Sequence, residues 1–367
     1  MIIGFHKFGH LALEPDLALL KIDDEKKKKA HRLPLDCYLW SLGPKHLRAN
    51  RVLAELWGQR IRVIPSWLID GFVRVGRIFP ALELEVPKPS IHGPANRQIS
   101  TPPPLHLSQQ QEKEAKAAIL EMGLNPNQPF VCLIVRDSGH NADPSGVENP
   151  GYEFRNFDID VFSDAAIALS KRGYQVVRMG AGKEKAFSLK HEGVFDYATS
   201  IHRTELLDIY LAANCAFAIS TQTGPDAVCL LFRRPVCFVD IPLFSQFFFG
   251  TGLAFWNPTV YSQRGRKLSL REIIDADLLW EKSTEELLAK QIEGVRSTPI
   301  EIQQNVMGFV EMYESGFVLT KQQEIVLDEA NLIISSGMGL EGETVFGQIQ
   351  ARFNPPFLTR NAEWFLR

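Results

Sequence analysis

The sequence predicts an α/β fold. Short apolar segments alternate with amphipathic ones almost from the first residue, as expected of a parallel sheet flanked by helices. The chain has 367 residues, of which 45% are hydrophobic and 23% charged, close to the average of soluble domains. At roughly 150 residues per domain, this length corresponds to about two domains.

The first half of the chain carries a weaker form of this alternation. We expect strands over residues 2–5, 37–42 and 61–64 and helices over residues 11–21 and 46–57. Prolines crowd the stretch 87–104, which has no periodicity and few large apolar residues. Such a composition is typical of a linker. The predicted N-terminal Rossmann-like domain therefore covers residues 1–104 and ends in the linker 87–104.

The second half shows the alternation more clearly. We expect helices over 109–122, 159–172, 204–214 and 226–232 and strands over 130–135, 174–179, 215–220 and 235–240. These units predict a second Rossmann-like domain over residues 105–300. Residues 301–367 are expected to form helices and an apolar tail that returns to the N-terminal domain.

Composition excludes several classes of protein. Forty basic against 43 acidic residues give a net charge of -3, which argues against a general nucleic-acid binder. Five cysteines without CxxC spacing indicate buried thiols in a cytoplasmic protein. We expect no signal peptide, and the uncharged run 241–263 contains too many prolines, glycines and polar residues for a membrane span.

Familiar catalytic motifs are missing from the sequence. It contains no GxxxxGK[ST], no GxGxxG after the first strand, no HExxH and no GxSxG, which removes the main support for ATPase, Rossmann dehydrogenase, zincin and α/β-hydrolase activities. The acidic residues form no obvious divalent-metal cluster. We therefore expect a metal-independent site without a tightly bound cofactor.

Candidate site residues follow the predicted strands, because parallel sheets bind ligands beyond the carboxyl ends of their strands. Gly9 and His10 follow the first strand. The glycine would permit close approach of a bound oxyanion, and the histidine could act as a base or a phosphate partner. The alternative is a capping or surface histidine.

Cations lie at the ends of three further predicted elements. Arg136, Asp137 and Ser138 come after a strand, and an arginine there can bind a diphosphate with two hydrogen bonds. Arg136 and Asp137 could instead pair with each other. Arg155 and Asn156 precede a helix, where Asn156 or Asp158 could be only its N-cap. Arg178 ends the next strand and is predicted, like Arg136, to be a diphosphate ligand.

The most informative strand end carries hydroxyls before a helix. A buried strand ends in Ser220, Thr221, Gln222 and Thr223, and then Gly224 and Pro225 open a helix. Free backbone N–H groups and hydroxyls at a helix N-terminus suit a phosphate or diphosphate. The alternative is a satisfied N-cap with nothing bound.

These features together look like a GT-B glycosyltransferase. The segment 204–240 is similar to the donor-binding region of heptosyltransferase-like enzymes. The motifs FGHLALEPD, VRDSGH, FRNFDID, YQVVRMG, DYATS and FNPPFLTRN resemble a bacterial glycosyltransferase family associated with surface-polysaccharide gene clusters. They extend from Phe8 to Asn361, over nearly the whole chain.

The resemblance implies two Rossmann-like domains that face each other across a cleft, with the N-terminal domain on the acceptor side. It implies transfer of a sugar from a nucleotide-diphosphate sugar to a glycan, lipid-linked or protein acceptor, in the synthesis of a surface polysaccharide or glycoconjugate. His10 and Arg136 are the expected catalytic residues. The donor cleft would be bordered by Arg136, Asp137, Ser138, Arg155, Asn156, Arg178, Gly180, Asp196 and Tyr197.

Two departures from the family pattern imply a donor preference that differs from that of the family. The turn at 220–224 is not rich in glycine or serine, and Ala181 stands where an acidic residue is common. Asp196 and Tyr197 would lie near the base or ribose, although Tyr197 could equally be a packing residue.

Other interpretations of the sequence remain open. The aromatic stretch 244–256 could shape the acceptor side or contact the inner face of a membrane, or it could belong to the core. A nucleotide-sugar 2-epimerase-like enzyme and a non-catalytic nucleotide- or glycan-binding protein are the alternative functions. The sequence does not predict the oligomeric state.

Overall fold

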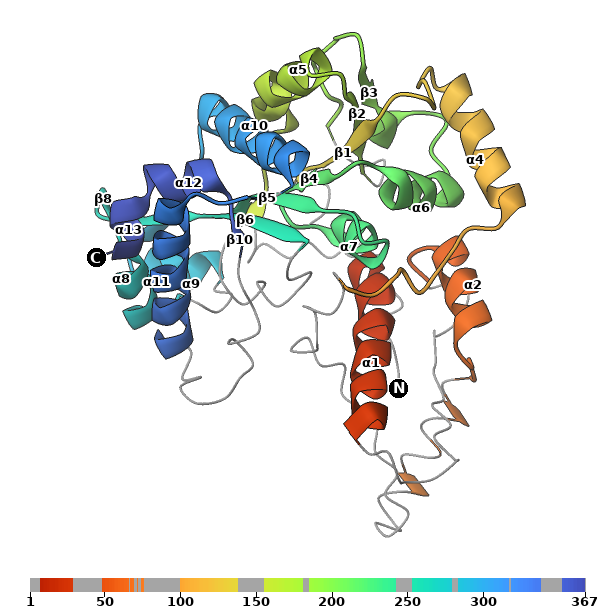
Figure 1. Cartoon of the computed structure of the whole chain (residues 1–367), viewed down its shortest axis with the longest axis horizontal. Helices are drawn as coiled ribbons and strands as arrows, with labels where there is room; N and C mark the ends of the chain where they lie inside the picture. The colour runs from red at the N-terminus through yellow and green to blue at the C-terminus, as the bar shows by residue number, and fades with distance from the viewer. Residues whose placement is uncertain are drawn as a thin grey trace.

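A parallel sheet forms the centre of the protein in the computed structural model (Figure 1). The structure describes residues 7–28, 48–65, 67–68, 71, 74–75, 100–137, 155–180, 185–241, 253–278, 283–316, 318–337 and 352–366. The strands of the sheet are β1 (Phe130–Ile134), β2 (Gln175–Met179), β3 (Val194–Asp196), β4 (Ala218–Ser220), β5 (Val236–Ile241), β6 (Ala254–Pro258) and β10 (Arg352–Phe353). Their order is β10-β6-β5-β4-β1-β2-β3, and every neighbouring pair is parallel.

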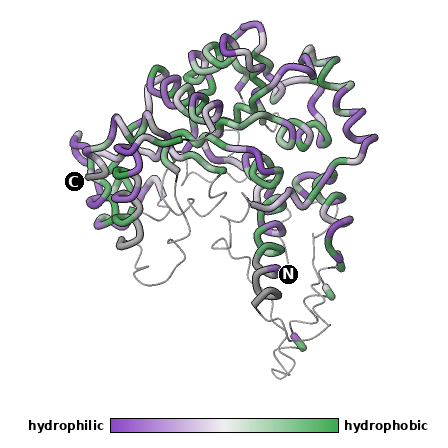
Figure 2. The backbone as a smooth tube through the Cα atoms, viewed as in Figure 1, coloured by the Kyte–Doolittle hydropathy of each residue, from purple (hydrophilic) through white to green (hydrophobic). Residues whose placement is uncertain are grey.

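The strands are apolar because helices cover both faces of the sheet. Successive residues of β1 alternate between the two faces: Val131 and Leu133 pack in one core cluster, and Cys132 and Ile134 pack in the other. Figure 2 shows the central strands as mainly hydrophobic. The predicted α/β class is therefore confirmed.

Described helices lie on both faces of the sheet. The helix α5 (Ser163–Lys171) follows the short 3₁₀ turn η6 (Ile159–Phe162) and packs beside α10 (Pro299–Ser315). On the opposite face lie α6 (Glu205–Asn214) and α7 (Gly224–Leu231), with α4 (Gln109–Glu121) against α6 (Figure 1). A capping box at Ser108 begins α4, and Gly123, with a φ of 90°, follows its end.

A second, antiparallel sheet was not predicted from the sequence. Its strand order is β8-β7-β9, and its first strand, β7, follows β6 in the chain. The strands are β7 (Val260–Gln263), β8 (Arg266–Lys267) and β9 (Ile292–Val295), and they are accompanied by α8 (Leu270–Asp275) and α9 (Thr284–Ala289). Strand β9 leads directly to the start of α10.

The described residues that precede α4 are mainly helical. The helices α1 (Phe8–Lys28) and α2 (Arg51–Arg60) pack against α7 and α6, respectively. The predicted strands at 2–5 and 37–42 lie outside the described residues. The predicted strand at 61–64 is not formed, and only a single bridge residue, Val63, occurs there. The division into domains at residues 104 and 300 stays a prediction.

The described part of the C-terminal tail packs on the second half of the chain, and its predicted return to the N-terminal domain stays a prediction. Strand β10 extends the main sheet beside β6, and α12 (Pro355–Arg360) lies on α10. The helix α13 (Ala362–Leu366) packs on α8 and α11 (Lys321–Gly337). A glycine explains the close contact: a Cβ on Gly308 would lie 2.0 Å from Pro356 Cγ.

Candidate functional site

The candidate site lies at the carboxyl ends of β1 and β4, where the direction of the strand order reverses. Strands β3, β2, β1, β4, β5 and β6 follow one another in the sheet, which is the order of a doubly wound Rossmann fold. In this order, β1 and β4 are neighbours at the topological switch point, and ligands bind beyond their carboxyl ends. Two hydrogen bonds join the strands there: Thr221 N–H donates to Ile134 O (3.1 Å), and Arg136 N–H donates to Thr221 Oγ1 (2.8 Å).

The turn from β4 into α7 is held by a buried carboxylate. Asp226 Oδ2 accepts from Ser220 Oγ and from Thr223 N–H, both at 2.7 Å. Gln222 takes a left-handed φ of 66°, and its N–H donates to Ser220 Oγ. Burial raises the pKa of Asp226 to about 6. Ser220 and Thr221 are buried and bonded to protein atoms, so their hydroxyls position the turn. Gln222, Thr223 and Gly224 remain at least partly exposed.

Two predicted arginines are fixed at this edge of the sheet. Arg155 Nη2 donates to the backbone O and the Oε1 of Gln222, each at 3.3 Å. Arg136 Nε donates to Asn156 Oδ1 at 3.2 Å. Asn156 is therefore not the N-cap of the following helix. Asp158 is that cap, because its Oδ1 accepts from Asp160 N–H.

Arg178 corrects a sequence prediction. It was predicted to be a diphosphate ligand, but its side chain is 0% exposed and bonds to Asp196 Oδ1 at 2.9 Å. Asp137 Oδ2 lies 3.8 Å from its Nη2, so Asp137 faces Arg178. The two carboxylates also accept the N–H groups of Lys185 and Phe187. Arg178, near the end of β2, thus connects Asp137, which follows β1, with Asp196, which ends β3.

The edge beyond β2 and β3 contains a second buried network. Tyr197 is fully buried, and its hydroxyl donates to Asp208 Oδ1 at 2.9 Å, so it is a packing residue in this structure. Arg203 Nη2 also bonds Asp208, while its Nε donates to the backbone O of Gly180 at 2.8 Å. Burial raises the pKa of Asp208 to about 6.

Gly9 and His10 lie in the first turn of α1, which begins at Phe8. A Cβ on Gly224 would lie 3.2 Å from Gly9 N and 3.1 Å from Phe8 Cβ. The close approach predicted for Gly9 is therefore to the start of α7. His10 is exposed, and its Nδ1 lies 2.5 Å from Glu14 Oε1.

The remaining predicted residues divide between described and undescribed parts of the chain. Ser138 lies outside the described residues, as do 244–252 of the aromatic stretch. The described end of that stretch forms β6, where Phe255 and Trp256 are buried. For these residues the core interpretation holds.

Sequence reasoning missed Arg296 at the same edge. Its Nη2 donates to the backbone O of Asn156 at 3.3 Å, and its guanidinium carbon lies 4.0 Å from the centre of the Phe157 ring. The available signal was weak: Thr298, Pro299 and Glu301 mark the start of α10 just beyond it. Nothing in that pattern indicates that Arg296 reaches Asn156.

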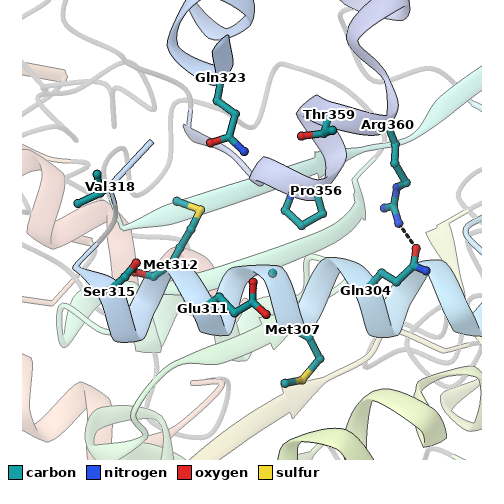
Figure 3. Close-up of a pocket in the computed structure, with 11 residues that line it drawn as sticks. Gln304, Met307, Glu311, Met312, Ser315, Val318, Gln323, Pro356, Thr359 and Arg360 are labelled. Carbon is teal, nitrogen blue, oxygen red and sulfur yellow. Dashed lines mark hydrogen bonds between the residues drawn. The ribbon is translucent and has the colours of Figure 1, made fainter. Parts of the chain in front are cut away.

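A separate groove lies between α10, α11 and α12 (Figure 3). Pro356 sits over α10, and Gln304 accepts a hydrogen bond from Arg360. The groove is lined by Gln304, Met307, Gly308, Glu311, Met312, Ser315, Val318, Gln323, Pro356, Thr359 and Arg360. None of the predicted site residues is among them.

The described residues show neither a cluster of metal ligands nor a helix that could span a membrane. In the part of the chain that the structure describes, no group of three or more His, Cys, Asp or Glu side chains is arranged to hold a metal ion. Among the described helices, none combines the length and the apolar character needed to cross a bilayer.

Comparison with known proteins gives two distant structural likenesses. No family model and no curated protein matches the sequence. The ADP-heptose lps heptosyltransferase II of E. coli is 19% identical, with a TM-score of 0.32 over 51% of this chain and 53% of that chain. A protein of glycosyl transferase family 9 from Veillonella parvula DSM 2008 is 14% identical, with a TM-score of 0.28 over 42% of each chain. The chain thus covers about half the length of these proteins.

Proposed function

We propose that the chain is a glycosyltransferase that binds a nucleotide-diphosphate sugar at the carboxyl ends of β1 and β4. The observation that carries the proposal is the bond from Arg136 N–H to Thr221 Oγ1, which joins these strands at the switch point. Nucleotides bind Rossmann folds at this point. Arg136, Arg155 and the N-terminus of α7 supply the positive charge that a diphosphate requires.

In this proposal the nucleoside diphosphate is the leaving group. As the glycosidic bond breaks, negative charge grows on the diphosphate, and guanidiniums already in place stabilise it more strongly than they stabilise the intact donor. We expect this stabilisation to need no metal ion. Arg178 acts indirectly, by holding Asp137 and Asp196 at the strand ends. Gly180 and Asp196 would border the nucleoside.

The acceptor is assigned to the N-terminal half. We expect residues 1–104 to form a second Rossmann-like domain that faces residues 105–300 in a GT-B arrangement. The contact between Gly224 and the first turn of α1 supports this assignment, since it brings Phe8 and Gly9, the two residues before His10, to the start of α7. Glu14 would orient the His10 imidazole as the acceptor base or as a phosphate partner.

The acceptor would be a glycan, lipid-linked or protein molecule in the synthesis of a bacterial surface polysaccharide or glycoconjugate. The reaction would take place in the cytoplasm, with peripheral contact to the inner face of the membrane where the acceptor is lipid-linked.

A nucleotide panel tests donor binding. Thermal unfolding is measured with UDP, GDP, CDP, ADP and TDP, with CMP and magnesium as controls. A ligand at about 100 times its dissociation constant stabilises by roughly 2.7 kcal/mol. We expect a base-selective shift that does not depend on magnesium, that is lost in Arg136→Met and that is kept in Arg271→Met, which changes an exposed arginine on α8. The absence of a shift with every nucleotide would overturn the proposal.

Turnover distinguishes an enzyme from a binding protein. The nucleotide selected by the panel is supplied as its diphosphate sugars, and release of nucleoside diphosphate is followed with candidate acceptors. Release that depends on an acceptor supports transfer. Tight binding without release would favour the non-catalytic alternative. His10→Ala with unchanged turnover and unchanged donor affinity would remove His10 from the mechanism.

A further inference from the structure

Arg296 lies at the same edge of the sheet as Arg136, although it comes from a distant part of the chain. It follows β9 and precedes the N-cap of α10, Thr298. Its side chain lies over the Phe157 ring and donates from Nη2 to the backbone O of Asn156. Arg136 donates from Nε to the side-chain Oδ1 of the same asparagine. Two guanidiniums therefore flank Asn156, one on its backbone and one on its side chain.

The backbone that presents Arg296 is held by Asp240. The Oδ2 and Oδ1 of this carboxylate accept from the N–H and hydroxyl of Ser297, at 2.7 and 2.6 Å. Asp240 has a φ of 47°, in the left-handed region that is unfavourable for non-glycine residues, at a register shift between β5 and β6. Strain of this kind is retained where the surrounding structure enforces it, often at functional sites. Asp240 therefore holds Ser297, the residue that follows Arg296, in place.

Within the described residues, the Arg296 guanidinium makes one hydrogen bond, to the backbone O of Asn156. Asp240 directs both oxygens to Ser297, and no carboxylate in the described residues bonds the Arg296 guanidinium. Burial lowers the pKa of Arg296, although the nearby Asp240 carboxylate attracts the guanidinium. The hydrogen bond to Asn156 uses one N–H of a group that has several. A polyanion that contacts both guanidiniums would offset the desolvation of Arg296.

We propose that Arg136 and Arg296 form a two-armed site for the diphosphate of the donor, with Asn156 as the spacer between the arms. The inference rests on the proposed function and deepens it. Each arm binds one phosphoryl group, so Arg296 discriminates nucleoside diphosphates from nucleoside monophosphates. Asp240 is a positioning residue that acts through Ser297.

The test compares the two nucleotide classes in one variant. By calorimetry on the full chain, Arg296→Met should weaken binding of the preferred nucleoside diphosphate by roughly 10-fold to 100-fold, the loss of a charge-assisted hydrogen bond. Binding of the corresponding monophosphate should change by less than about twofold, well below the loss of one such bond. Methionine keeps an apolar chain over Phe157, and Arg271→Met is the matched control.

Further variants separate this inference from the proposed function. Arg296→Lys keeps the charge and should recover part of the lost diphosphate affinity, which a folding defect would not allow. Equal losses for the two nucleotide classes, or no loss for either, would overturn the two-armed site. If Arg136→Met alone lowers the affinity, the nucleotide site stands and the role of Arg296 falls. If the wild-type chain binds no nucleotide, both proposals fall.

Discussion

Arg233 and Asp16 form a buried ion pair that joins the turn after α7 to α1. The guanidinium donates from Nη1 to Asp16 Oδ2 at 2.7 Å and from Nη2 to Asp16 Oδ1 at 3.0 Å. Its Nε also donates to the backbone O of Thr101 at 3.1 Å, in the segment that leads to α4. One side chain therefore connects three separate parts of the chain. It keeps α1 in place against α7, whose N-terminus belongs to the candidate site.

Breaking this pair should destabilise the fold. Asp16→Asn keeps the shape of the side chain but leaves the Arg233 guanidinium buried without its carboxylate, which typically costs roughly 3–5 kcal/mol. Urea unfolding measures the change. The control is Glu205→Gln, which breaks the more exposed pair with Arg51 and should cost less than about 1 kcal/mol. Equal losses in the two variants would show that the buried pair does not hold α1.

Arg178 should matter for stability more than for nucleotide affinity. Arg178→Met leaves Asp137 and Asp196 without the guanidinium between them and should lower the free energy of unfolding by roughly 3–5 kcal/mol. Arg178→Lys keeps the charge and should lose less. In the lysine variant we expect nucleotide affinity to fall less than in Arg136→Met. An unchanged stability together with a large loss of affinity would instead identify Arg178 as a ligand.

Protonation of Asp226 should stabilise the folded protein as the pH falls from 7 to 5. The folded-state pKa is raised to about 6, above the value near 3.9 of an unfolded chain. The folded state therefore binds the proton first, and the contribution of this group to stability rises as the pH falls from 7 to 5, by about 1 kcal/mol.

Asp226→Asn provides the comparison for this effect. Asparagine can still accept from Ser220 and Thr223 through its Oδ1 but does not titrate. The change in unfolding free energy between pH 7 and pH 5, measured by urea unfolding, should be less favourable in the variant by that amount. An identical pH response in both proteins would assign a normal pKa to Asp226.

The sequence predicted the buried strands better than the site. The apolar runs of β1 and β5 are visible because parallel strands are covered on both faces. Strand β10, with two residues, and the short antiparallel sheet are too brief to show a pattern. Local sequence also places Arg178 at a strand end without showing that two carboxylates enclose it. Arg296 was missed because only the order of the strands brings it to Asn156.

The contact between Gly308 and Pro356 offers a test of how the tail docks. Gly308→Ala would place a Cβ within 2.0 Å of Pro356 Cγ, so α12 must move away from α10. We expect lower thermal stability and faster proteolysis at the C-terminal tail, because Phe357 and Leu358 would lose their buried positions. Gly58→Ala is the matched control, since its Cβ would meet nothing within 4 Å, and alanine within the helix α2 should stabilise by roughly 0.5–1 kcal/mol. If both variants gain stability, the tail does not depend on this contact, and another surface must hold it.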